Sequence, residues 1–200
     1  EIDALGAPID MLIGNAGVLF SELRQVRGLE MHFVVNHLGH FILVNRLLKR
    51  VLAAPQGRVV IVGSNNHMQA PNGGIQFDRL SGEGWGNYYH HSKLANGLFS
   101  LELAARLAGT RATSNCLTPG PVRGTRILRN VSSSSDNYPK SVAQGAATQC
   151  YVATHPSLAE VSGEYFADCN PAAQSDAQRD KAMAAKLWEV STQLTKKYLA

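Results

Sequence analysis

A tyrosine and a lysine four positions apart are the first residues of this 200-residue chain whose spacing suggests chemistry. They lie in the stretch NYYHHSKLAN, residues 87 to 96, which also contains a second tyrosine, Tyr88. Each residue of an α-helix advances about 100° around the axis, so Tyr89 and Lys93 lie within roughly 40° of each other, whereas Tyr88 points away. If the stretch is helical, it holds one phenol beside one ammonium group.

Such a pair can move a proton. A tyrosine in water has a pKa near 10 and is almost always protonated at neutral pH. An ammonium group beside it favours the phenolate, which lowers that pKa and makes Tyr89 a plausible proton donor and acceptor. A serine hydroxyl facing the same space, such as that of Ser64, could hold a carbonyl or alcohol oxygen against the phenol. The alternative for Ser64 is an ordinary turn or helix-capping serine.

The elements that would position these residues alternate between strand and helix. Short apolar runs rich in β-branched residues predict buried strands at 10–14 and 58–63, and a third candidate spans 112–117. Helical spacing of apolar residues predicts helices over 29–54 and 85–108. This alternation indicates one α/β domain with a parallel sheet. Farther on, the pattern predicts a helix at 141–155, a strand at 163–168 and a terminal helix from 175, capped by Ser175.

Two further polar signals lie on these elements. The stretch GNAGV, residues 14 to 18, follows a predicted strand, and its small residues Ala16 and Gly17 permit close backbone approach to a ligand. An ordinary glycine turn is the alternative. Asn36 lies in an otherwise apolar helical segment, where an amide is either a partner-bonded core residue or part of a site.

The amino-acid composition argues against several classes of function. The net charge is +4 and the pI is near 9.1, but the basic residues are spread out and no aromatic residues interleave with them, which argues against nucleic-acid binding. Three widely spaced cysteines argue against a disulfide framework and favour a reducing compartment. We expect a cytoplasmic protein without a transmembrane segment, because the longest apolar runs are too short. We expect no metal site, since His37 and His40 lack a third ligand at matching spacing and His90 and His91 point to different faces.

Five motifs in order, GNAG, VNHLGHF, VVIVGS, YHHSKLAN and TPGPV, resemble the short-chain dehydrogenase/reductase family. The later stretches SKLANGLFSLELAARL and AQGAATQCYVATHPSLAEVSGEYFADC are similar in particular to the branch that contains the retinol dehydrogenases and the WW-domain oxidoreductase. The resemblance covers nearly the whole chain. It implies a Rossmann-like, doubly wound parallel sheet, of which residues 1–200 are the carboxyl-terminal two-thirds of a single domain.

The resemblance also implies roles for individual residues. Tyr89 would be the acid/base group, Lys93 would lower its pKa and hydrogen-bond the nicotinamide ribose, and Ser64 would orient the substrate oxygen. Asn36 would hold the water that links Lys93 to solvent. The cofactor would be NADP, or else NAD. Its adenosine side would lie against Asn15, Ala16 and Gly17, its nicotinamide beside Pro119, Gly120 and Val122, and its amide or phosphate near Thr125.

The chain departs from the family pattern at several positions. Gly14 stands where a first Asn is common, Gly63 where this branch often has a first Ser, and Gly124 where the family usually places the Thr expected at the cofactor. No strand is followed by Gly-x-x-x-Gly-x-Gly, the turn that binds pyrophosphate, and the family's first βαβ units would precede Glu1. None of these departures removes a predicted catalytic group.

The predicted function is hydride transfer between a nicotinamide dinucleotide and a hydrophobic or bulky alcohol, ketone or aldehyde. The alternatives are a non-catalytic binding or scaffold protein that retains the fold, and an inactive truncated fragment. Residues 123–140 include the run Ser132 to Ser135 and are either a substrate lid or a bland surface loop. The helices over 29–54 and 85–108 could pair with a second subunit, although burial within one chain explains them equally well.

Overall fold

A mostly parallel sheet forms the centre of the computed structural model, which describes residues 6–71, 73–130 and 137–199. Its strand order is β1-β4-β5-β6-β7. Strands β1 (Met11–Gly14), β4 (Arg58–Val62), β5 (Thr113–Thr118) and β6 (Tyr165–Ala167) run parallel, and β7 (Asn170–Pro171) is antiparallel to β6. A separate hairpin pairs β2 (Gln25–Val26) with β3 (Leu29–Glu30).

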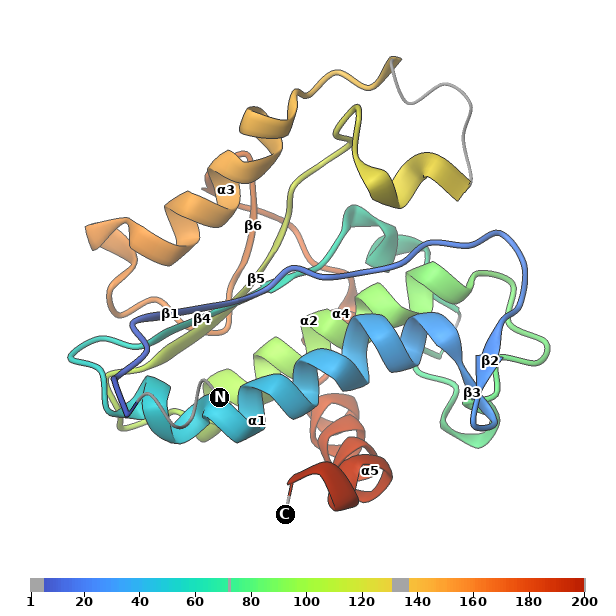
Figure 1. Ribbon diagram of the computed structural model, residues 1–200, viewed down its shortest axis with the longest axis horizontal. Helices are drawn as coiled ribbons and strands as arrows, with labels where there is room; N and C mark the ends of the chain where they lie inside the picture. The colour runs from blue at the N-terminus through green and yellow to red at the C-terminus, as the bar shows by residue number, and fades with distance from the viewer. Residues whose placement is uncertain (1–5, 72, 131–136, 200) are drawn as a thin grey trace.

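Helices cover both faces of this sheet, as Figure 1 shows. On one face lie α1 (Gly39–Leu52) and α2 (Tyr88–Arg106), with α5 (Lys181–Leu199) packed against them. On the other face lies α3 (Val142–Thr154). This arrangement confirms the predicted α/β fold. The shorter helical segments are η2 (Phe33–Leu38), η3 (Asn65–Gln69), η4 (Phe77–Arg79), η5 (Arg126–Asn130), η7 (Pro156–Leu158) and α4 (Asp176–Arg179).

Strand β4 is apolar because both of its faces are covered. All five of its residues are buried. Val59 and Ile61 pack into the cluster under α1 and α2, whereas Val60 and Val62 pack into the cluster under α3. Full burial of such a side chain contributes roughly 1.5 to 3 kcal/mol. The strand therefore joins the two halves of the core.

Strand β5 is also completely buried, although four of its six side chains are polar. The Ser114 hydroxyl lies 3.0 Å from that of Ser100 on α2. The Asn115 side chain donates to the Val161 carbonyl at 2.7 Å and accepts from the Glu164 backbone N–H at 3.0 Å. Because a buried polar group without a partner is costly, these bonds explain how a polar strand occupies the core.

Burial of α2 arises within one chain. Every residue from 91 to 100 on this helix is buried. The Trp188 ring of α5 packs against Phe41 at 5.0 Å and Phe99 at 5.7 Å between ring centroids. Contacts within the chain thus account for the burial of this stretch of α2. On α1, Leu43 and Leu52 are exposed.

Two predicted helices differ from the observed ones. The helix predicted over 29–54 starts later, because residues 29 and 30 form β3 and residues 33–38 form a π-helix. The terminal helix predicted from 175 breaks at Asp180, whose backbone is extended. The Asp180 carboxylate instead accepts from the Met183 backbone N–H at 2.9 Å. The predicted Ser175 cap is confirmed, since its hydroxyl accepts from the Gln178 backbone N–H.

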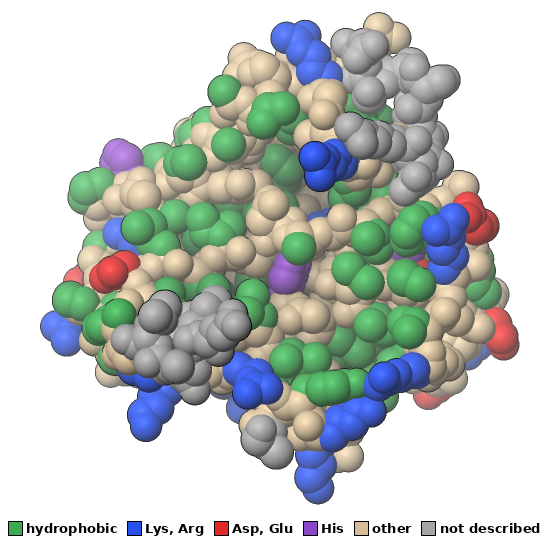
Figure 2. Space-filling view, viewed as in Figure 1, with side chains coloured by type: hydrophobic (Ala, Val, Ile, Leu, Met, Phe, Trp, Pro, Cys, Tyr) green, Lys and Arg blue, Asp and Glu red, His purple; other side chains and the backbone are tan. Residues whose placement is uncertain are grey.

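The described helices include none that is long and apolar enough to cross a membrane. Viewed from the same side as Figure 1, the surface carries hydrophobic side chains across its middle, and many of its Lys and Arg side chains lie along the lower edge (Figure 2).

Several histidines are buried in the core. Burial lowers the pKa of His37 to about 3, of His40 to about 4 and of His91 to about 3. Neighbouring positive charge acts in the same direction, on His37 through His40 and on His40 through Lys93. The folded protein therefore holds these three rings neutral at pH values where the unfolded chain would protonate them.

We expect this difference to make the fold acid-sensitive. Between the unfolded pKa near 6.5 and the folded values, the unfolded state binds more protons, so stability is fully present above pH 6.5 and is lost as the pH falls. Each histidine contributes a slope of up to about 1.4 kcal/mol per pH unit. Urea unfolding between pH 7.5 and 4.5 measures it. His40→Leu should flatten the dependence, and Leu47→Met in the same helix should not; parallel curves for the parent and His40→Leu would contradict the prediction.

Candidate active site

Three predicted site segments meet at one edge of the sheet. Asn15 follows β1, Ser64 comes shortly after β4, and Pro119 follows β5. These strands are adjacent and parallel, so their carboxyl ends share an edge. This is the edge at which open α/β sheets bind ligands.

The first turns of α2 bring Tyr89 and Lys93 to the same place. The helix begins at Tyr88, so the two residues share a face as their spacing predicts. The Lys93 Nζ atom donates to the Val62 carbonyl at 2.9 Å and lies 5.5 Å from the centroid of the Tyr89 ring. The Lys93 side chain is almost completely buried. The carbonyl at the end of β4 thus fixes the ammonium group beneath the tyrosine.

Ser64 caps a short helix and lies beside Tyr89. Its hydroxyl accepts from the Asn66 backbone N–H at 3.2 Å and so caps η3. The same side chain lies beside the Tyr89 phenol, where it opposes the effect of burial on the pKa of Tyr89. Two hydroxyl groups therefore face each other next to Lys93, a geometry that can hold one substrate oxygen between them.

The expected lowering of the Tyr89 pKa is not found. Burial raises the pKa of Tyr89 to about 12, against the opposing effect of Ser64. Burial also lowers the pKa of Lys93 to about 8. The prediction considered only the charge of Lys93, whereas removal of the phenolate from water is the larger effect here. Without a ligand, Tyr89 is held protonated.

The Asn36 side chain is fully bonded inside the protein. Its amide nitrogen donates to the Val18 carbonyl at 3.1 Å and to the Ser92 hydroxyl at 3.0 Å, and its oxygen accepts from the Val18 backbone N–H at 2.7 Å. The Ser92 hydroxyl donates to the Tyr89 carbonyl at 2.8 Å. Asn36 therefore connects the segment after β1 to the start of α2, which is the core role considered for it.

The backbone around Asn36 forms a π-helix, a feature that often marks functional sites. The Gly39 N–H bonds back to the Val34 carbonyl, five residues earlier. The Asn36 carbonyl lies beside the His40 ring, where it opposes the lowering of the His40 pKa by burial and by Lys93. A water-binding role for Asn36 would consequently fall to its backbone carbonyl, because the side chain is occupied.

The residues predicted to contact a cofactor differ in accessibility. Asn15 and Ala16 are exposed, Gly17, Pro119 and Gly120 are half-buried, and Val122 is buried. Gly120 has a φ of 73°, a conformation that side chains rarely adopt. The Thr125 hydroxyl donates to the Val122 carbonyl at 3.3 Å.

Glycine replaces the residue that is common in the family at positions 14 and 63, and the neighbouring side chains explain both cases. A Cβ atom at Gly14 would lie 3.2 Å from Cγ of His40, so the histidine ring fills the space that a side chain at position 14 would need. A Cβ atom at Gly63 would lie 2.7 Å from Sγ of Cys116. Glycine at these positions is therefore matched to the larger neighbours His40 and Cys116.

Sequence reasoning missed Lys140, which holds the turn after β5. Its Nζ atom donates to the Pro119 carbonyl at 2.9 Å and forms an ion pair with Asp168. Its backbone carbonyl accepts from the Arg123 N–H at 2.9 Å. These bonds join the two ends of the predicted lid, residues 123–140. The run Ser132 to Ser135 lies outside the described residues, and the lid stays a prediction.

No cluster of three or more potential metal ligands occurs among the residues that the structure describes. A hollow of about 550 Å³ lies at the opposite ends of β4 and β5, between the end of α2, the start of β5 and residues near Glu160. Its lining includes none of the predicted catalytic or cofactor residues. The predicted catalytic and cofactor residues therefore lie outside this hollow.

An open parallel sheet with helices on both faces, and with polar groups at its carboxyl edge, defines the Rossmann-like class of α/β folds. The family model for short chain dehydrogenase matches residues 1–136. The chain belongs to the short chain dehydrogenase family.

Curated relatives agree with this assignment. The chain is 37% identical over 209 residues to short-chain dehydrogenase TIC 32 A, chloroplastic, from Brassica napus, covering 96% of this chain and 65% of the relative. It is 39% identical over 197 residues to human retinol dehydrogenase 14, covering 92% of this chain and 57% of the relative. The chain thus spans about three-fifths of the length of these relatives.

A solved structure has the same fold. A putative uncharacterized protein from Mycobacterium Paratuberculosis superposes with a TM-score of 0.73 at 30% identity, covering 95% of this chain and 68% of that one. The predicted resemblance to the family, and to its retinol dehydrogenase branch, is confirmed by these comparisons.

Lys93 should reduce the stability of the fold. Its pKa of about 8 lies below the ordinary value of 10.5, so the unfolded state binds more protons between these two values and stability rises with pH in that window. At pH 7 the shift corresponds to a cost of about 3 kcal/mol. We expect Lys93→Met to be more stable than the parent at pH 7, by about 1 to 3 kcal/mol after lost packing and hydrogen bonding are included.

Chemical denaturation at pH 7 and at pH 10 measures this difference. Lys186→Met, at an exposed lysine, is the control and should change stability by less than about 0.5 kcal/mol. A Lys93→Met variant that is less stable than the parent at pH 7 would show that the buried ammonium group stabilises the fold.

Proposed function

We propose that this chain carries the proton-transfer site of a nicotinamide-dependent oxidoreductase that interconverts an alcohol and a carbonyl compound. The observation that carries the proposal is the pair of hydroxyl groups on Ser64 and Tyr89 beside the buried Lys93, at the carboxyl edge of the sheet. Membership of the short chain dehydrogenase family supports it.

In the reducing direction, Tyr89 gives its hydroxyl proton to the carbonyl oxygen of the substrate as the carbonyl carbon gains a hydride. In the oxidising direction, Tyr89 takes the proton of the alcohol. Ser64 donates a hydrogen bond to the same oxygen and keeps it within reach of the phenol. Lys93 stabilises the phenolate that Tyr89 becomes, and the Asn36 carbonyl would hold a water that carries the proton towards solvent.

The residues at the sheet edge fit the nicotinamide half of a dinucleotide. The left-handed Gly120 allows close backbone approach, and the Lys93 ammonium has donors beyond its bond to Val62 for a ribose hydroxyl. When bound, the cofactor supplies or accepts the hydride. Within the 200-residue sequence no Gly-x-x-x-Gly-x-Gly turn offers a pyrophosphate site. The proposed cofactor is NADP, with NAD as the alternative, held by Asn15, Ala16, Gly17, Pro119, Gly120, Val122 and Thr125.

The proposed substrate is an apolar or bulky alcohol, ketone or aldehyde. The similarity to a relative named retinol dehydrogenase supports this class. Pairing with a second subunit through the helices predicted over 29–54 and 85–108, a cytoplasmic location and the absence of nucleic-acid binding stay predictions. The relative TIC 32 A is described as chloroplastic, so similarity alone does not favour the cytoplasm.

A non-catalytic protein that retains the fold is the competing proposal. Retention of Ser64, Tyr89 and Lys93 in one constellation argues against it, because packing alone requires neither the hydroxyl pair nor a buried ammonium group. The competing proposal requires that the purified protein bind a dinucleotide, or a partner, without turnover of any alcohol or carbonyl compound.

We expect Tyr89→Phe to lower the turnover of an apolar aldehyde by about 10³-fold, because general acid/base catalysis contributes on this scale. Dinucleotide affinity should stay within about three-fold, since the lost hydroxyl acts on the substrate. Steady-state kinetics with NADPH or NADH, together with calorimetric binding, measures both.

Tyr88→Phe is the matched control. Tyr88 is adjacent to Tyr89, and its ring stacks on His32. Tyr88→Phe removes one phenol hydroxyl, which is the same chemical change as in Tyr89→Phe. It should leave turnover within about three-fold of the parent. Equal activity of Tyr89→Phe and the parent would refute the proposed function.

A further inference from the structure

A buried acid and histidine lie next to Tyr89. The Glu30 and His32 side chains are completely inaccessible to solvent, and Glu30 Oε1 lies 2.5 Å from His32 Nδ1. The Glu30 carboxylate also accepts from the backbone N–H groups of His32 at 2.9 Å and Phe33 at 2.8 Å. These contacts satisfy the carboxylate, which caps the helical segment that begins at residue 31.

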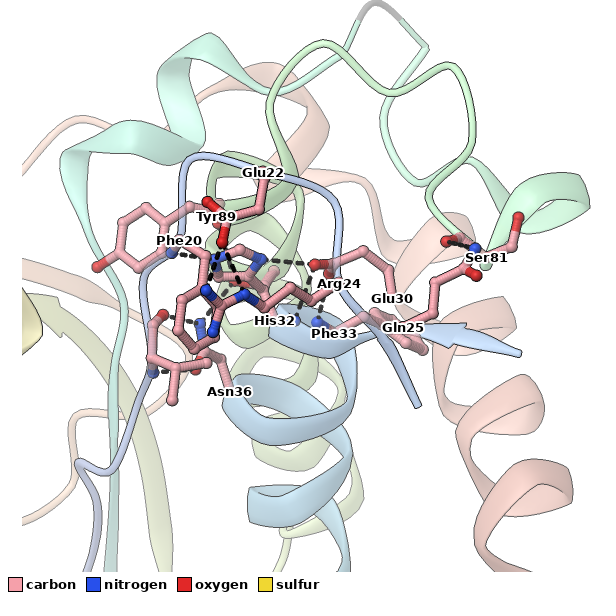
Figure 3. Close-up of polar contacts among 12 residues, drawn as sticks. Phe20, Glu22, Arg24, Gln25, Glu30, His32, Phe33, Asn36, Ser81 and Tyr89 are labelled. Carbon is pink, nitrogen blue, oxygen red and sulfur yellow. Dashed lines mark hydrogen bonds and ion pairs between the residues drawn. The ribbon is translucent and has the colours of Figure 1, made fainter. Parts of the chain in front are cut away.

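The second nitrogen of His32 defines its hydrogen-bonding state. His32 Nε2 accepts from the Phe20 backbone N–H at 2.9 Å, so this nitrogen carries no hydrogen. The ring hydrogen is then on Nδ1 and is donated to Glu30. Figure 3 shows the His32 ring between the Glu30 carboxylate and the Phe20 backbone. The Glu30–His32 pair therefore does more than cap a helix, because it also bonds the start of that helix to the backbone of Phe20.

The histidine that holds this segment is itself in contact with Tyr89. The edge of the His32 ring faces the Tyr89 ring, with centroids 6.1 Å apart and planes at 77°. The Phe20 ring lies 5.6 Å from the same histidine and beneath the Arg24 guanidinium, 3.9 Å away. Two residues earlier, both backbone groups of Val18 bond to Asn36. Residues 18–20 are thus held by Asn36 at one end and by His32, the neighbour of Tyr89, at the other.

We propose that Glu30 and His32 form a positioning unit that holds residues 18–20 as one wall of the substrate site and so sets which apolar substrates reach Tyr89. The inference rests on the proposed function for the identity of the substrate. It assigns no proton transfer to the pair. Glu30 bonds the His32 ring, His32 bonds the Phe20 backbone, and the half-buried Phe20 side chain lies against the same His32 ring that contacts Tyr89.

Two substitutions of His32 separate its two bonds. In His32→Gln, the side-chain oxygen can replace Nε2 as acceptor for Phe20 while the bond to Glu30 is weakened. In His32→Asn, the shorter amide can replace Nδ1 as donor to Glu30 but cannot reach Phe20. Both variants lose the ring and its packing, so a merely structural role would affect them alike.

The first readout is hydrogen exchange of the Phe20 amide, measured by NMR, which requires no turnover. His32→Asn should speed this exchange by about ten-fold relative to His32→Gln, as expected for loss of one hydrogen bond. Equal exchange in the two variants would overturn the inference. If His32→Asn does not fold, ring-nitrogen NMR of the parent decides: hydrogen on Nδ1 supports the pair, and hydrogen on Nε2 overturns it.

The second readout compares a short and a bulky apolar aldehyde. His32→Asn should raise KM for the bulky substrate by about ten-fold, with kcat within about three-fold, and His32→Gln should resemble the parent. An equal loss of kcat on both substrates in both variants would indicate a structural role only and overturn the inference. Failure of the proposed function is separate, because it would appear as an active Tyr89→Phe while the Phe20 exchange result is unaffected.

Discussion

The Lys93 side chain places an ammonium group inside the protein, where its Nζ atom donates to the Val62 carbonyl at the end of β4. Asn96, one turn later on α2, donates to the same carbonyl at 3.1 Å. These two bonds fix α2 against the sheet edge and thereby set the position of Tyr89 opposite Ser64. The pKa of Lys93 falls to about 8 because burial disfavours the charge, so the site is assembled at a cost to stability.

Side-chain hydrogen bonds also hold the segments that surround Lys93. Asn36 bonds to Val18 and to Ser92, which connects the segment after β1 with the first turns of α2. Lys140 holds the turn after β5 through the Pro119 carbonyl. The segments at the carboxyl edge of the sheet are consequently held by side chains from other elements. A non-catalytic scaffold protein would not require this degree of organisation.

Much of the fold and site could be predicted because it depends on local pattern. The apolar runs predict β1 and β4, and the spacing of Tyr89 and Lys93 predicts their shared face. The bonds of Asn36 to Val18 and Ser92 could not be predicted, because these partners are distant in sequence. The hydrogen bond from the Phe20 backbone to His32 could not be predicted for the same reason. The direction of the Tyr89 pKa was predicted wrongly, since burial is a property of the folded chain and not of a four-residue spacing.

Titration of Tyr89 itself tests the central chemical role most directly. The protein would be labelled with ¹³C at the tyrosine ring carbon that bears the hydroxyl, with Tyr89→Phe identifying the resonance, and titrated with and without an oxidised nicotinamide dinucleotide. If Tyr89 is the acid/base group, its pKa is about 12 in the free protein and falls by about two units or more on binding, because the positive nicotinamide ring and Lys93 then both favour the phenolate. A pKa that binding leaves unchanged would contradict that role.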